Sequence, residues 1–266
     1  MCGYPWQIQH TWTLIMPRKK RTDDPIGVGM TAKQMRRRKP INTDMLVDIE
    51  PLTDNQKVLF DHYAEGKNLF AYGAAGTGKT FISLYMGLRD VLDENTPYDK
   101  LYIVRSLVTT REIGFLPGDH EDKAALYQIP YKNMVKYMFE MPTDADFEML
   151  YGNLKTQETI SFWSTSFIRG TTLDNCIVLV DEMQNLNFHE LDSIITRVGD
   201  NCKIIFCGDA TQTDLTRDKE RNGILDFKRI VEQMESDFGA VEFDIDDIVR
   251  SGLVRNYLVT KLALAL

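Results

Sequence analysis

Hydrophobic and polar positions follow two alternating patterns from about residue 52 onward. Short, nearly continuous apolar runs indicate buried strands, and longer stretches with helical spacing fall between them. The expected strands are Asn68–Tyr72, Leu101–Val104, Cys176–Val180, Lys203–Cys207 and Ala240–Phe243, and the expected helices include one from Thr53, Thr80–Leu92 and Leu191–Val198. This alternation predicts an α/β fold with a mostly parallel sheet and helices on both faces.

Two regions depart from this pattern. Residues 111–170 are less regular, and we expect them to insert beside the sheet. The stretch Asn256–Leu266 is expected to form an amphipathic helix that buries Leu258, Val259, Leu262 and Leu264. No apolar run reaches the roughly 18 residues that a membrane-spanning helix needs, so we expect no membrane partner.

Charge divides the chain into two parts. Residues 17–40 carry a net charge of +7, whereas residues 41–266 carry −15. We expect 1–44 to be a disordered basic segment, with 1–15 as a possible mis-called start before Met16, and 45–266 to be one domain. Because affinity for nucleic acid comes largely from cations, polymer binding should be local or use the basic segment. A merely solvated charge run is the alternative interpretation.

Cysteine and histidine residues give no metal-site pattern. The four cysteines, Cys2, Cys176, Cys202 and Cys207, form no CxxC pair. The last three lie within or beside apolar runs and suit small buried hydrophobes in a reducing cytoplasm. The histidines are scattered without ligand spacing, so we expect no zinc site.

A glycine-rich stretch, residues 73–80, fits G-x-x-x-x-G-K-[ST] between an expected strand and an expected helix. Its backbone N–H groups would cradle phosphates, Lys79 would reach the β- and γ-phosphates, and Thr80 would ligate Mg²⁺. The expected nucleotide-binding residues are therefore Gly73, Ala74, Ala75, Gly76, Thr77, Gly78, Lys79 and Thr80.

An apolar strand ending in two carboxylates supplies the second motif. Asp181 is expected to hold Mg²⁺ through water, and Glu182 to orient and deprotonate the attacking water. An adjacent Asp–Glu pair favours hydrolysis over transfer to a small molecule, because water is the nucleophile that needs a base.

Two glutamines are further candidates. Gln212 ends the stretch 208–212 and could donate to the γ-phosphate or the attacking water, with a plain polar turn as the alternative. Gln56 precedes the glycine-rich stretch, and its amide could pair with the adenine edge and select ATP. An exposed helical glutamine is the alternative interpretation for Gln56.

These motifs together resemble the PhoH-like family, whose core is similar to one RecA-like domain of superfamily 1 helicases. The resemblance runs from about Leu52 to Leu258, and this compact form is similar to the phage-encoded branch. It rests on 114–119 with Lys123, 167–173, 181–185 (where Met183 departs from the family), 208–212 and 248–254. The resemblance implies a RecA-like P-loop fold, ATP with Mg²⁺, and Arg250 as a nucleotide-contacting arginine.

The leading hypothesis is a cytoplasmic ATPase that acts on RNA or single-stranded nucleic acid, in the host cytoplasm if phage-encoded. The second is a nucleotide-dependent switch or scaffold with weak ATPase activity and a protein partner. A small-molecule kinase is disfavoured, because such kinases need a lid that bears several arginines. Residues 111–170 contain only Arg111 and Arg169. The residues before 52 lack the spread of acidic residues that the metal site of a nuclease domain requires, so we expect no ribonuclease activity.

The expectation of a single RecA-like core leads to an expectation about oligomeric state. Such a core leaves one side of the nucleotide open, so a further cation would come from Arg250 in cis or from a neighbour's Arg169 or Arg105. Head-to-tail contacts of this kind close into rings, which predicts a homo-oligomer, most simply a hexamer. A monomer with slow turnover is the alternative.

Overall fold

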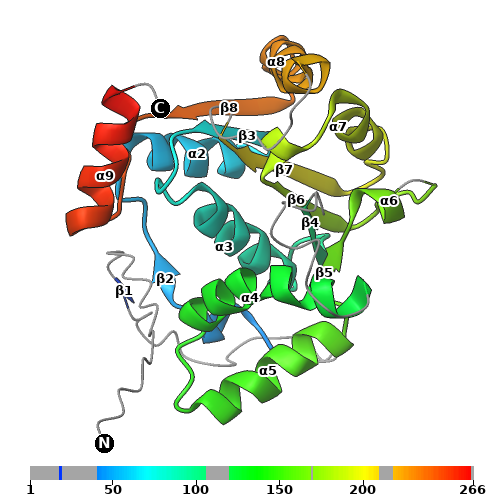
Figure 1. Cartoon of the computed structure of the whole chain (residues 1–266). Helices are drawn as coiled ribbons and strands as arrows, with labels where there is room; N and C mark the ends of the chain where they lie inside the picture. The colour runs from blue at the N-terminus through cyan, green and yellow to red at the C-terminus, as the bar shows by residue number, and fades with distance from the viewer. Residues whose placement is uncertain (1–17, 20–40, 106–119, 169, 210–217, 265–266) are drawn as a thin grey trace, which may run out of the picture.

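A six-stranded sheet forms the centre of the molecule (Figure 1). The structure is a computed structural model that describes residues 18–19, 41–105, 120–168, 170–209 and 218–264. The strand order is β5-β4-β6-β7-β3-β8, and every pairing is parallel. The strands are β3 (Asn68–Gly73), β4 (Lys100–Arg105), β5 (Ile160–Trp163), β6 (Cys176–Asp181), β7 (Cys202–Gly208) and β8 (Phe238–Phe243). The predicted α/β class with a parallel sheet is confirmed.

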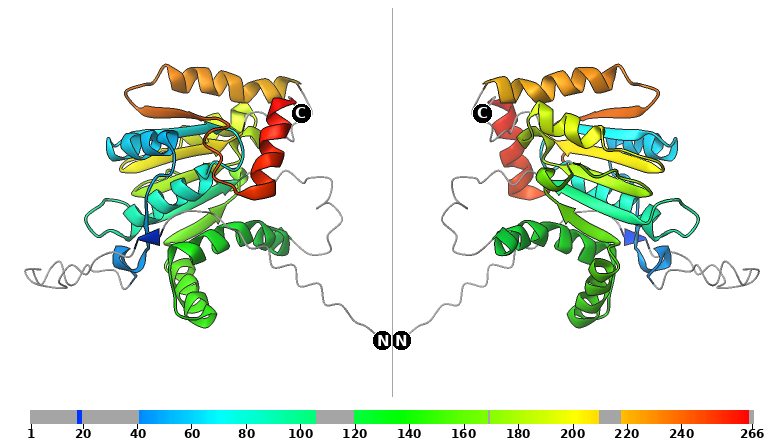
Figure 2. Two further views of the ribbon diagram at one scale, coloured as in Figure 1. Left: turned by 90° about the vertical axis from the view of Figure 1, so that its left-hand side faces the viewer. Right: turned by 90° about the vertical axis from the view of Figure 1, so that its right-hand side faces the viewer.

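Helices cover both faces of this sheet, as Figures 1 and 2 show from three directions. One apolar core lies on the face covered by α2 (Asp54–Ala64), α3 (Lys79–Leu92), α4 (His120–Met138) and α5 (Asp144–Thr156). A second core lies on the other face, with α6 (Thr165–Ile168), α7 (Phe188–Ile195) and α8 (Asp218–Glu232). The sheet therefore has no solvent-facing side along its central strands.

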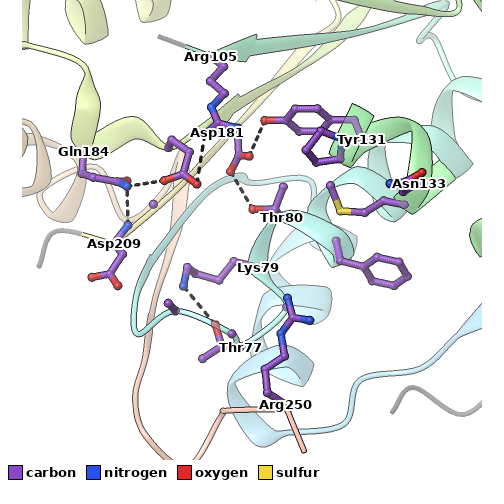
Figure 3. A pocket seen from close by; sticks show the side chains of 18 of the residues that line it. Thr77, Lys79, Thr80, Arg105, Tyr131, Asn133, Asp181, Gln184, Asp209 and Arg250 are labelled. Carbon is purple, nitrogen blue, oxygen red and sulfur yellow. Dashed lines mark hydrogen bonds and ion pairs between the residues drawn. The ribbon is translucent and has the colours of Figure 1, made fainter. Parts of the chain in front are cut away.

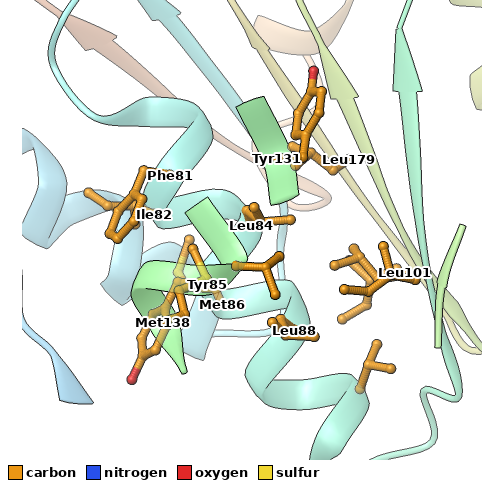
Figure 4. Close-up of a cluster of buried hydrophobic side chains, with 14 of the residues drawn as sticks. Phe81, Ile82, Leu84, Tyr85, Met86, Leu88, Leu101, Tyr131, Met138 and Leu179 are labelled. Carbon is orange, nitrogen blue, oxygen red and sulfur yellow. The ribbon is translucent and has the colours of Figure 1, made fainter. Parts of the chain in front are cut away.

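The central strands are mostly apolar because both of their faces are buried. In β6, Ile177 and Leu179 enter the core under α3, while Val178 and Val180 enter the core under α7. Figure 4 shows the first core, where α3 packs between the sheet and α4. Full burial of each such side chain contributes roughly 1.5–3 kcal/mol, which explains the continuous apolar runs.

The region 111–170 is more regular than the sequence indicated. Its described part contains α4, α5 and β5, and β5 adds an edge strand beside β4. β5 has only four residues, and α4 contains Pro130 within the helix, so neither gives a strong local pattern.

The C-terminal helix α9 (Gly252–Ala263) forms, but its predicted burial is wrong. Leu258 and Val259 are only half-buried, and Leu262 and Leu264 are exposed. Leu253 and Tyr257 are 84% and 65% exposed. The apolar residues lie on several sides of this helix, so the domain can cover only part of them.

The described part of the N-terminal segment also differs from expectation. Arg18 and Lys19 form the short strand β1, which pairs antiparallel with β2 (Asp48–Ile49), because the edge of β2 offers unpaired backbone groups. A 3₁₀ turn, η1 (Thr43–Met45), follows Ile41, which already belongs to the core. The remainder of the disorder prediction, 1–17 and 20–40, lies outside the described residues.

Within the described residues, Cys176, Cys202 and Cys207 are free thiols, and Cys176 and Cys207 are buried. None of the helices in the described ranges is both long and apolar enough to cross a membrane.

Candidate nucleotide-binding site

The two motif strands end at the same edge of the sheet. β3 leads into the glycine-rich loop and β6 ends at Asp181, with β7 between them. In parallel sheets, ligands bind outside the carboxyl ends of the strands, where connections leave for opposite faces. Figure 3 shows the pocket at this edge. It has a volume of about 390 Å³ and is lined by the loop, the ends of β4, β6 and β7, the helix α4 and Arg250. We call it the nucleotide pocket.

The glycine-rich loop, residues 73–80, is anchored on β8. Gly73 has φ +114°, and a Cβ there would lie 2.1 Å from the Phe243 carbonyl oxygen, so only glycine fits. The Ala74 N–H donates to the same oxygen at 2.8 Å. Of the predicted binding residues, Gly73 and Ala74 form this anchor, whereas residues 75–80 line the pocket.

Lys79 begins α3, and its ammonium is folded onto the loop. Nζ donates to the carbonyl oxygens of Gly73 at 2.9 Å and Ala74 at 2.6 Å, and to Thr77 Oγ1 at 3.2 Å. Burial lowers the pKa of Lys79. A phosphate oxygen entering the loop would offer this cation a charged acceptor in place of neutral ones.

Thr80 and Asp181 meet as the sequence predicted. The Thr80 hydroxyl donates to Asp181 Oδ1 at 2.8 Å, and the two residues are 101 positions apart in the chain. Hydroxyl and carboxylate oxygens are ligands that Mg²⁺ accepts beside phosphate oxygens and water, so this pair fits the expected metal. Their third partner, which was not predicted from the sequence, is Tyr131 of α4, whose hydroxyl donates to Asp181 Oδ2 at 2.6 Å.

Glu182 follows β6 in a left-handed conformation, with φ 52°. Its Oε2 accepts from Gln184 Nε2 at 2.5 Å, and its Oε1 lies 3.8 Å from Arg105 Nη2. Gln184 in turn accepts the Asp209 N–H on Oε1 at 2.9 Å. Burial, followed by the negative charge of Asp181, raises the pKa of Glu182. The Gln184 side chain thus holds the carboxylate, and the backbone N–H of Asp209 holds the Gln184 side chain.

A sequence signal was present for both Gln184 and Asp209, because they lie in the family-like stretches 181–185 and 208–212. Tyr131 carried no local signal, since only the fold brings it to Asp181.

Two arginines line the pocket. Arg250 precedes α9, and the Val249 N–H donates to the Gly76 carbonyl at 3.1 Å, which ties this segment to the loop. Burial lowers the pKa of Arg250. Arg105, proposed from sequence as a residue for a neighbouring subunit, lies in this chain's own pocket beside Glu182.

Gln56 is another predicted binding residue that does not line the pocket. Its side chain is fully buried behind the loop. Gln212, Arg169 and the stretch 114–119 lie outside the described residues, so their predicted roles stay predictions.

The contact between Tyr131 and Asp181 makes a testable prediction. Tyr131→Phe removes one hydrogen bond to the carboxylate and keeps the ring against Phe162, whose centroid is 5.5 Å away. We expect turnover of Mg²⁺–ATP to fall by about tenfold, the usual scale for a group that orients a metal-binding carboxylate, with more Mg²⁺ needed for half-maximal rate. Steady-state turnover against Mg²⁺ concentration measures both.

Tyr151→Phe is the matched control for Tyr131→Phe. Tyr151 lies on α5, and its hydroxyl has no hydrogen-bond partner within the described residues. Identical Mg²⁺ dependence for Tyr131→Phe and Tyr151→Phe would remove Tyr131 from the site.

Comparisons with known proteins give a consistent family match. The family model described as PhoH-like protein matches residues 48–260. Protein PhoH of Escherichia coli strain K12 is 34% identical over 199 residues, covering 73% of this chain and 53% of that protein. Protein PhoH2 of Bacillus subtilis strain 168 is 32% identical over 143 residues, covering 53% of this chain and 31% of that protein. This chain thus spans at most about half the length of these relatives.

Among solved structures, this chain is similar to a Pif1 helicase from Candida albicans, at 15% identity and a TM-score of 0.34. The similarity covers 73% of this chain and 40% of that one. A likeness this distant adds no weight to the assignment of the site.

Proposed function

This chain belongs to the PhoH-like protein family, and we propose that it is an Mg²⁺-dependent ATPase that acts on RNA or another single-stranded nucleic acid. The observation that carries the proposal is the contact of Thr80 Oγ1 with Asp181 Oδ1 at 2.8 Å, beside Lys79 and Glu182 in one pocket. This arrangement supports the proposed roles of a phosphate-binding loop, a metal-binding pair and a base that act together.

Each side chain has a role in the proposed hydrolysis. The loop N–H groups and Lys79 hold the β- and γ-phosphates. Glu182 takes a proton from water as the water oxygen attacks the γ-phosphorus and the bond to the bridging oxygen breaks, which releases ADP and phosphate. Magnesium, held by Thr80 and through water by Asp181, would neutralise phosphate charge when bound. Arg105 and Arg250, which line the pocket, add positive charge in cis, and Gln212 remains a proposed sensor of the γ-phosphate.

The nucleic-acid part of the proposal is tested by stimulation of turnover. We expect single-stranded RNA or DNA to raise ATP turnover severalfold and duplex DNA to have little effect, because the acidic body disfavours non-specific duplex binding. The stimulation should weaken as salt rises. Steady-state rates with each polymer measure it, and Glu182→Gln shows whether the stimulated activity belongs to this site.

A second function is favoured by α9. This helix exposes apolar side chains, including Leu253 at 84%, and the segment before it is tied to the loop through Val249 and Gly76. An exposed apolar surface beside the nucleotide is suited to a protein partner whose binding depends on the nucleotide. Slow turnover that no polymer stimulates would favour this switch or scaffold.

The proposal includes assembly into a homo-oligomer, with a hexameric ring as the leading arrangement. Exposed apolar residues on α9 support a subunit contact near the pocket. Arg105 lies in its own chain's pocket, so Arg169 is the remaining candidate for a cation supplied to a neighbour.

We further propose that the protein acts in the cytoplasm, or the host cytoplasm if it is phage-encoded. Free thiols at Cys176, Cys202 and Cys207 support a reducing compartment.

A further inference from the structure

Gln56 lies in the first turn of α2, which begins after the N-cap Thr53. Both ends of its side-chain amide have protein partners. Oε1 accepts from the Leu52 N–H at 2.7 Å, and Nε2 donates to the Thr77 carbonyl oxygen at 2.9 Å. The side chain is 0% exposed. An amide held in this way faces the glycine-rich loop from behind and does not face a ligand in the pocket.

The Thr77 carbonyl determines the direction of the next N–H group. A trans peptide is planar, so the C=O of Thr77 and the N–H of Gly78 point in opposite directions. Because Gln56 draws the carbonyl toward the back of the loop, the Gly78 N–H is directed to the side of the nucleotide pocket, which Gly78 lines. That N–H is one of the groups available to a phosphate oxygen.

This peptide needs an external anchor. Gly78 has φ +85°, and glycine takes positive and negative φ about equally well, so residue 78 itself does little to prevent rotation of the 77–78 peptide. The Thr77 side chain is also fixed, since Oγ1 donates to the Ala74 carbonyl at 3.1 Å and accepts from Lys79 at 3.2 Å. Gln56 therefore joins α2 to a hydrogen-bonded network that reaches Lys79.

We propose that Gln56 is a positioning residue that fixes the Thr77–Gly78 peptide and thereby preforms the loop for the polyphosphate of any nucleoside triphosphate. It does not read the adenine base. Because Gln56 is fully buried, pairing with adenine would require its amide to move out from behind the loop, and the Thr77 carbonyl and the Leu52 N–H would then lose their hydrogen bonds. The inference rests on the proposed function, because it concerns phosphate binding at the same site.

Binding of three ligands separates positioning from base recognition. ATP, GTP and inorganic tripolyphosphate, each with Mg²⁺, are titrated by calorimetry into the parent, Gln56→Ala and Gln56→Glu. Glutamate keeps the size of the side chain but puts a carboxylate oxygen against the Thr77 carbonyl. We expect both variants to lose affinity by about tenfold, by the same factor for all three ligands. Lys57→Ala, an exposed neighbour on α2, is the control and should match the parent.

The opposite pattern would overturn the inference. If ATP binding weakens while GTP and tripolyphosphate binding stay unchanged, Gln56 reads the base. Unchanged binding of all three ligands would exclude any role in the site.

Hydrogen exchange tests the same idea without a ligand. In the nucleotide-free protein, we expect backbone amides of residues 73–80 to exchange faster in Gln56→Ala and Gln56→Glu than in Lys57→Ala, with the rest of the sheet unchanged. Equal exchange in the loop would contradict the inference even if the parent binds no nucleotide. Failure of the parent to bind ATP would instead refute the proposed function.

Discussion

Replacing Lys79 by alanine is expected to weaken Mg²⁺–ATP binding by about 10²-fold or more. The Lys79 ammonium is held by two carbonyl oxygens and the Thr77 hydroxyl, all within 3.2 Å. Binding would add charged phosphate acceptors at the same place, and charge-assisted hydrogen bonds contribute more than neutral ones. Alanine removes every one of these contacts and leaves the phosphate charge without its nearest protein cation.

Calorimetric titration with Mg²⁺–ATP measures the loss. Lys136→Ala is the matched control, because Lys136 pairs with Asp144 on the surface and does not line the nucleotide pocket. Thermal unfolding of both variants shows whether the loop contacts of Lys79 also stabilise the fold. Binding by Lys79→Ala as tight as by the parent would mean that the nucleotide does not occupy residues 75–80.

The geometry of the loop and the two carboxylates could be predicted from the sequence because the relevant signals are local. A glycine-rich stretch between a strand and a helix has few conformations that satisfy its backbone. The strand before Asp181 is apolar at every position, which marks it as interior. Parallel pairing then brings Thr80 to Asp181, although 101 residues separate them.

The partners of these residues could not be predicted, because tertiary structure alone creates the contacts. Tyr131 reaches Asp181 only because α4 packs across α3, and nothing near Tyr131 in the sequence marks that position. Gln56 illustrates the same limit: its residue type suggested a role with adenine, whereas the fold turns it toward Thr77. Local patterns identify motifs, and packing decides which neighbours orient them.

The helix α9 shows how an apolar pattern can mislead. The pattern of an amphipathic helix predicted burial of Leu258, Val259, Leu262 and Leu264. Tyr257 and Leu253 on the same helix are exposed instead. Sequence patterns cannot tell a surface buried within one chain from a surface reserved for a partner.

Glu182 is the residue on which the proposed chemistry depends most. Its left-handed backbone, φ 52°, costs energy in a side chain of this type and recurs at functional sites. Gln184 and Arg105 hold its two oxygens from different sides. The carboxylate thus has a fixed position beside Asp181, which suits a base that must meet one water molecule.

Glu182→Gln is therefore expected to keep Mg²⁺–ATP binding near that of the parent and to slow hydrolysis by about 10²-fold or more. Glutamine retains the shape of the side chain and an oxygen that can accept from Gln184, but it cannot take a proton from water. Single-turnover hydrolysis, alongside calorimetric titration of ATP, separates the two effects. Glu148→Gln, which changes an exposed carboxylate paired with Lys132, is the matched control. Turnover by Glu182→Gln equal to that of the parent would assign the base to another residue, because a glutamine at position 182 cannot take the proton.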